Sequence, residues 1–134
     1  MRSRIAVLAV TVALVLAAGA AARAHHSFAA EYDRTKPITL KGTVTRVEWQ
    51  NPHIYFYLDV KGANGVVENW AIEGGAPNTL YRAGWRKDSL QVGNEVTVDG
   101  WLAKSGAKLA NMRAVVLADG SRVFGGSSGG DQQN

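Results

Sequence analysis

The segment from His53 to Val60 alternates between apolar and other side chains with a period of two. Successive side chains of a β-strand point to opposite faces, so this period predicts a strand with one face on a core. The apolar set consists of Ile54, Phe56, Leu58 and Val60. The opposite set consists of His53, Tyr55, Tyr57 and Asp59. The pattern therefore favours a β domain with an aromatic and polar outward face on this strand.

Similar segments precede and follow this strand. Residues 38–49 also alternate, but the phase changes near Thr45-Arg46, which predicts a long strand with a bulge. Asn51-Pro52 and Ala63-Asn64-Gly65 are turn signals on either side of the 53–60 strand. Further strands are expected over 66–73, 95–102 and 110–117, the last with a short extension to 124.

One helix is predicted between the third and fourth strands. Pro77 suits a first helical position and Gly84 the position just after a helix end, which predicts a helix over 77–83. The resulting order, β-β-β-α-β-β with a long bent first strand, is typical of a five-stranded OB-like barrel. A small open β-sandwich is the alternative. We assign an all-β, OB-like barrel to residues 37–124, preceded by an N-terminal arm over 25–36.

The first 24 residues have the three regions of a secretory signal. Basic Arg2 and Arg4 precede an apolar run that leads to Ala22-Arg23-Ala24, a small-residue cleavage site. An uncleaved anchor helix is the alternative, but the run is shorter than the roughly 20 residues that a membrane span needs. We expect cleavage after Ala24, export to the periplasm and no stable membrane anchor afterwards. Residues 125–134 carry no apolar side chain and are expected to be disordered.

The composition of the chain without residues 1–24 excludes several classes of function. Without residues 1–24, 12 Lys and Arg stand against 11 Asp and Glu, so the basic surface that nucleic-acid binding requires is missing. The sequence contains no cysteine, which excludes disulfides, thiolate metal sites and a thiol nucleophile. No serine lies in a nucleophile-elbow motif, and no two acidic residues have a spacing that indicates acid–base catalysis. We therefore expect a binding protein rather than an enzyme.

Histidine positions point to a metal. Cleavage after Ala24 would leave His25 with a free α-amine and an imidazole on one residue, and these two nitrogens can chelate a metal. His53 is the predicted distant ligand, and His26 is an alternative imidazole. Nitrogen ligands of this kind suit copper(II) better than zinc. Cleavage two residues earlier would expose Arg23-Ala24-His25, which is also a copper(II)-binding pattern.

An alternative function uses the outward face of the 53–60 strand. Tyr55 and Tyr57 could stack on a planar or sugar ligand, or form an adaptor surface for a protein of the cell envelope, without any metal. The same tyrosines could instead cover the barrel beneath the N-terminal arm, with Phe28 packed alongside. The four tryptophans are expected to serve packing.

Three segments together resemble a known family. They are 25–33, beginning His25-His26-Ser27-Phe28; 40–53, ending Trp49-Gln50-Asn51-Pro52-His53; and 68–85, which includes Glu68-Asn69-Trp70 and ends at Trp85. The chain is similar over residues 25–124 to a domain-of-unknown-function family of short exported bacterial proteins. The resemblance implies export and a barrel-like β fold. That family has no assigned activity, so it implies no catalytic or binding residue.

Overall fold

A computed structural model describes residues 28–125. The predicted signal segment, the two predicted ligands His25 and His26, and residues 126–134 of the predicted disordered tail lie outside the described residues. Within the described part of the chain, no helix has the length and apolar character needed to cross a membrane.

The elements of residues 28–125 follow the predicted order, with a short helix added in front and a short strand at the end. They are α2 (Phe28–Glu31), β1 (Tyr32–Glu48), β2 (Tyr55–Lys61), β3 (Val67–Glu73), α3 (Pro77–Arg82), β4 (Glu95–Ala103), β5 (Leu109–Leu117) and β6 (Arg122–Phe124).

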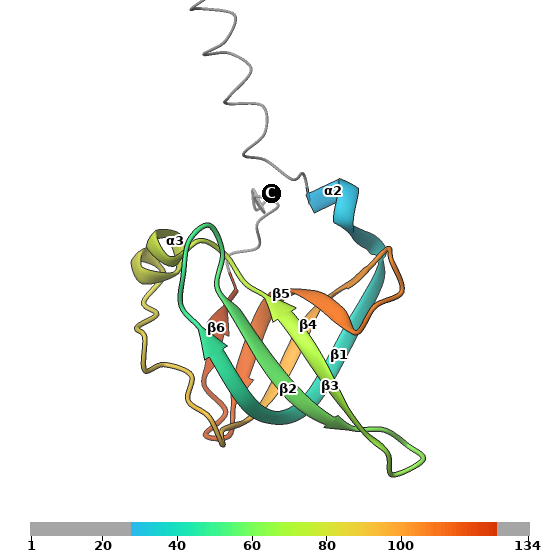
Figure 1. Ribbon diagram of the computed structural model, residues 1–134. Helices are drawn as coiled ribbons and strands as arrows, with labels where there is room; N and C mark the ends of the chain where they lie inside the picture. Colours follow the sequence, from blue (N-terminus) through green and yellow to red (C-terminus); the bar gives the residue numbers. More distant parts are fainter. Residues whose placement is uncertain (1–27, 126–134) are drawn as a thin grey trace, which may run out of the picture.

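The strands form a barrel-like ring (Figure 1). Neighbouring strands pair antiparallel in the order β3-β2-β1-β4-β5-β6, and a parallel pairing between β3 and β5 closes the ring of five. The short strand β6 pairs with β5 outside this ring. The all-β prediction of an OB-like five-stranded barrel, with one short helix between its third and fourth strands, is confirmed.

The barrel interior is filled by the apolar positions of the alternating strands. On β2 these are Phe56 and Leu58, and Ile54 lies just before the strand, all three fully buried. Leu80 of α3 and Trp85 beyond it are also buried in this core. Each such side chain stabilises the fold by about 1.5–3 kcal/mol through burial, so the helix is held by packing rather than by its length.

The predicted bulge in β1 is present at Thr45. Val44 pairs with Leu58 and Arg46 with Tyr57, so one extra residue of β1 is inserted between consecutive pairs. The strand begins at Tyr32, earlier than the expected start at residue 38, because Tyr32 also pairs with Ala103 of β4, with an irregular register between Tyr32 and Pro37. The chain entering β1 is thereby brought onto the barrel wall.

Several connections gather at one end of the barrel (Figure 1). Both α2 and α3 lie there, together with the loop between β1 and β2 that contains the cis Asn51–Pro52 bond and His53. The β2–β3 hairpin tip lies at the opposite end. The end that carries His53 is therefore also the end where the N-terminal arm arrives.

Candidate functional site

A second, smaller apolar core lies outside the barrel wall. It joins Phe28 and Tyr32 of the arm to Ala103 of β4, with Trp101 and Leu109 packed against them. The Phe28 ring lies 5.4 Å from the Tyr32 ring and 5.3 Å, edge-on, from the Trp101 ring. The backbone N–H of Lys104 donates to the carbonyl of Glu31 at 2.8 Å. These contacts hold α2 and the start of β1 against β4 and β5.

Glu73 lies next to this second core, where the hydroxyl of Tyr32 reaches it. On β3 the side chains of Trp70 and Ile72 belong to the barrel core, so alternation places Glu73 on the outward face. It pairs with Tyr55 of β2 on one side and with Asn111 of β5 on the other. Glu73 is nevertheless only 3% exposed, and the hydroxyl of Tyr32 from the arm bonds to its carboxylate. A carboxylate on the outward face of the barrel is thus buried where the arm contacts it.

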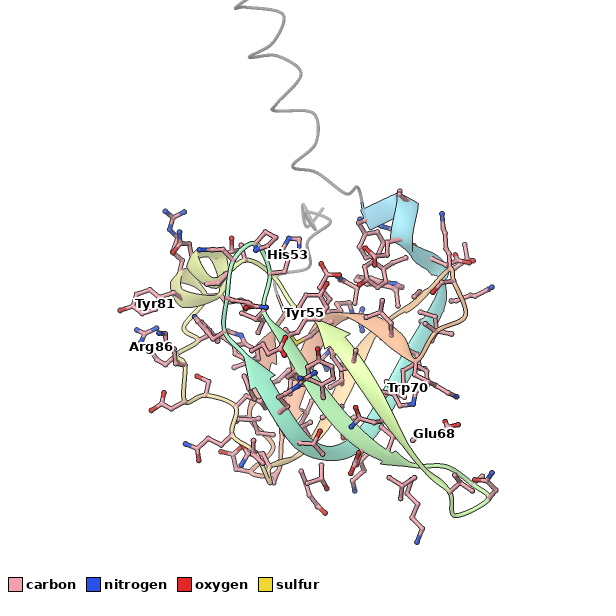
Figure 2. The ribbon with its side chains drawn as sticks, in the orientation of Figure 1. His53, Tyr55, Glu68, Trp70, Tyr81 and Arg86 are labelled. Atoms are coloured by element: carbon pink, nitrogen blue, oxygen red, sulfur yellow. The ribbon has the colours of Figure 1, made fainter. Side chains whose placement is uncertain are left out.

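The Glu73 carboxylate contacts His53, Tyr32 and Tyr55. Nδ1 of His53 lies 2.6 Å from Oε1, and the hydroxyl of Tyr32 donates to Oε2. His53 precedes β2, Tyr32 begins β1 and Glu73 ends β3, so three separate elements meet at this carboxylate. Figure 2 shows His53 beside α3 at the upper end of the barrel, with Tyr55 below it on β2. We call His53, Glu73 and Tyr32 the carboxylate triad.

The surroundings of Glu73 keep two neighbouring phenols, those of Tyr32 and Tyr55, protonated. Burial, a hydrogen bond to Glu73 and the negative charge of that carboxylate raise the pKa of Tyr32 well above its ordinary value. Burial, followed by the charge of Glu73 and a hydrogen bond to it, raises the pKa of Tyr55 in the same direction. Both shifts favour the protonated phenol, which can only donate to the carboxylate.

The contact with Glu73 determines which ring nitrogen of His53 can bind a metal ion or a proton. A neutral imidazole has one N–H and one bare nitrogen, and the N–H lies on the nitrogen that has an acceptor. Since Nδ1 faces Glu73, Nε2 is the bare nitrogen, and the side chain is 27% exposed. Carboxylate–histidine contacts of this kind orient metal-ligating imidazoles and also general bases. The site can therefore bind a metal ion or accept a proton at Nε2.

The two predicted ligand-face tyrosines have different surroundings. Tyr55 is half-buried beside Glu73 and belongs to the site. The Tyr57 ring is covered by the guanidinium of Arg46 at 3.7 Å, and its hydroxyl lies 3.5 Å from Oε2 of Glu48. Binding of a stacked ligand by both rings stays a prediction, and it would require Arg46 to move.

Of the three predicted metal ligands, only His53 lies among the described residues. His53 is at the triad, whereas His25 and His26 lie outside the described residues. Within residues 28–125 there is no group of three or more His, Cys, Asp and Glu side chains that could hold a metal ion. The described residues thus include one predicted ligand, His53, and the roles of His25 and His26 stay predictions.

Sequence reasoning missed Glu73 and Tyr32. A hairpin centred on Asn64 pairs Tyr55 with Glu73, so the turn signal could have placed this carboxylate beside the histidine strand. No sequence signal predicts that Tyr32 covers it. That contact depends on how the arm folds back over the barrel, between residues far apart in the sequence.

Comparison with known families finds that residues 12–112 match the model of a family of unknown function, DUF6152. No curated protein and no solved structure gives a match. The functional interpretation of this chain therefore depends on its own site.

Proposed function

The chain belongs to the DUF6152 family of unknown function, and we propose that it is a periplasmic copper(II)-binding protein. In this proposal a signal peptidase removes residues 1–24. The new α-amine and the imidazole of His25 chelate the metal, and Nε2 of His53 supplies the third nitrogen. The protein binds the ion and does not itself catalyse a reaction.

One observation carries the proposal: the 2.6 Å contact between Nδ1 of His53 and Oε1 of Glu73. Metal-ligating histidines almost always donate their second ring N–H to such an acceptor, which holds the ring orientation and makes the ligand nitrogen more basic. Glu73 is buried and accepts a second hydrogen bond from Tyr32, so its own position is restrained. His53 has the surroundings expected of a metal ligand.

The anchoring of the arm supports His25 as the partner of His53. Phe28 is buried against Tyr32, and Tyr32 bonds to the same carboxylate as His53. Only His26 and Ser27 separate His25 from Phe28, and three residue steps span at most about 10 Å. A terminus starting at His25 is therefore tethered at the end of the barrel that carries His53.

The donor set favours copper(II). Two imidazoles and an amine are borderline nitrogen ligands, and copper(II) has the highest affinity of the divalent first-row metals for such sites. Structural zinc sites usually take four ligands in a tetrahedron and often include thiolates, which this chain lacks. His26 remains the alternative imidazole if its ring, rather than that of His25, reaches the metal.

The test is a copper(II) titration of the mature protein, exported and purified with its first residue checked by intact mass. Competition with a chelator gives the Kd of the wild type, of His25→Ala, of His53→Ala and of the double variant. We expect one copper per chain, weaker binding in each single variant, and His26→Ala close to wild type. Equal affinity in the wild type and the double variant would contradict the proposal.

A further inference from the structure

Tyr32 has two roles that can be separated chemically. Its ring is 2% exposed and packs on Phe28, which anchors the arm. Its hydroxyl, at the far end of the ring, donates to Oε2 of Glu73 on the barrel wall. Removal of the hydroxyl alone would leave the ring packing in place.

The hydroxyl matters because Glu73 is buried. A buried carboxylate is tolerated only when its oxygens have donors, and loss of one donor leaves a desolvated acceptor. With the Tyr32 hydroxyl on Oε2, Oε1 remains directed at Nδ1 of His53. Tyr55 also hydrogen-bonds to Glu73. Without the Tyr32 hydroxyl, the carboxylate can turn toward Tyr55 or admit water, and His53 loses its fixed acceptor.

We propose that Tyr32 is a positioning residue for the metal ligand His53. It acts through Glu73, keeps the proton of the imidazole on Nδ1 and thereby presents Nε2 to the ion. Because Tyr32 also anchors the arm, one residue orients the His53 ligand and restrains the segment that delivers His25. This inference rests on the proposed copper site, but its effect on the position of the His53 ring proton is also expected in the protein without metal.

Tyr57 offers a matched control within the same sheet. It is a half-buried tyrosine on the neighbouring strand, and its hydroxyl lies near Glu48 instead of Glu73. Tyr32→Phe and Tyr57→Phe each delete one phenolic oxygen and keep a ring. A general loss of stability would affect both variants, whereas a role through Glu73 would affect Tyr32→Phe only.

The first experiment uses apo protein labelled with ¹⁵N-histidine, with the resonances of His53 assigned from His53→Ala. In the wild type and in Tyr57→Phe, the neutral ring should carry its proton on Nδ1. In Tyr32→Phe, a measurable fraction should carry the proton on Nε2. An unchanged tautomer in a folded Tyr32→Phe protein would overturn the inference, whether or not the protein binds copper.

The second experiment measures the copper(II) Kd of the same variants and the electron paramagnetic resonance spectrum of the bound ion. We expect Tyr32→Phe to bind about tenfold more weakly, at the lower end of the range for groups behind a metal ligand, with an altered spectrum. Tyr57→Phe should match the wild type. Equal Kd values and spectra for all three proteins would contradict the inference while leaving the copper site intact.

The wild type provides a check that does not depend on a variant folding. The phenolic proton of Tyr32 should exchange slowly with water because it is buried and bonded to Glu73. It should therefore give an observable proton resonance with contacts to Phe28. If Tyr32→Phe does not fold and no such resonance exists in the wild type, the inference is also wrong.

Discussion

The imidazole of His53 and the carboxylate of Glu73 meet at 2.6 Å, one from the loop before β2 and the other from the last residue of β3. The contact is made on the outside of the barrel wall, where Glu73 is buried and also bonded to Tyr32, and the His53 side chain is 27% exposed. It gives an otherwise ordinary surface histidine a defined orientation. The proposed copper site depends on this contact.

Replacement of Glu73 by glutamine should weaken copper(II) binding by about 10–100-fold. The amide keeps the shape of the side chain but has an NH2 donor in place of one carboxylate oxygen, so it cannot present an oxygen to both His53 and Tyr32 in the observed geometry. The Kd from chelator competition measures the effect. Glu68→Gln is the control, because Glu68 lies on the same strand and pairs with Lys108 at the surface. Similar Kd values for both variants would argue against a role for Glu73.

Replacement of Phe28 by alanine should release the arm. Loss of its contacts with Tyr32 and Trp101 should cost about 3–5 kcal/mol if the space stays empty, and copper affinity should fall because His25 is no longer tethered. Denaturant unfolding and copper competition measure the two effects. Val44→Ala, which removes a barrel-core side chain, should lower stability without changing the Kd. Unchanged copper affinity in Phe28→Ala would contradict the role of the arm.

The barrel could be predicted from sequence because its signals are local. The alternation around Phe56, the Asn64-Gly65 turn and the phase change at Thr45 each depend on neighbouring residues, and the structure has the corresponding strand, hairpin and bulge. His53, predicted at the start of this strand, lies just before β2, which begins at Tyr55.

The buried carboxylate could not be predicted in the same way. Glu73 has the alternation of an exposed residue, yet it is buried and bonded to Tyr32, which lies on a segment that the sequence predicts to be a polar arm. The contact between them depends on tertiary packing around Phe28 and Trp101, which no local period reports. The metal partner of His53 likewise stays a prediction, because His25 lies outside the described residues.

Tyr32 should make the fold sensitive to alkaline pH. Because the pKa of Tyr32 is raised above its ordinary 10.0 in the folded protein, the unfolded chain releases the phenolic proton first. The stabilisation is therefore complete below about pH 10 and is lost as the pH rises, by roughly 1 kcal/mol per pH unit. Denaturant unfolding from about pH 9 to about pH 12 should give a shallower decline for Tyr32→Phe than for the wild type.

The control for this pH dependence is a variant that lowers stability without removing a titratable group. Val44→Ala should shift the whole stability curve downward and keep the slope of the wild type. If the free energy of unfolding falls with pH equally steeply in the wild type and in Tyr32→Phe, the phenol of Tyr32 does not contribute to this pH dependence.

Gly100 should tolerate no side chain. A Cβ at this position would lie 2.1 Å from the carbonyl oxygen of Asn111 on the paired strand β5, so the two backbones would have to separate. We expect Gly100→Ala to lower the free energy of unfolding by about 1–3 kcal/mol. Gly62→Ala is the control, since its Cβ would first meet the flexible side chain of Asn64, at 3.0 Å. Equal stability of both variants would contradict this packing.

The most direct test of the copper site concerns the terminus created by signal cleavage. Mature protein that begins with a free His25 is compared with the same chain carrying an acetyl group on that amine, which keeps every imidazole. Copper(II) titration followed by electron paramagnetic resonance should give one tightly bound ion with three nitrogen ligands in the free-amine protein. The acetylated protein should lose that species and bind more weakly. Identical spectra and affinities for the two proteins would contradict the proposed site.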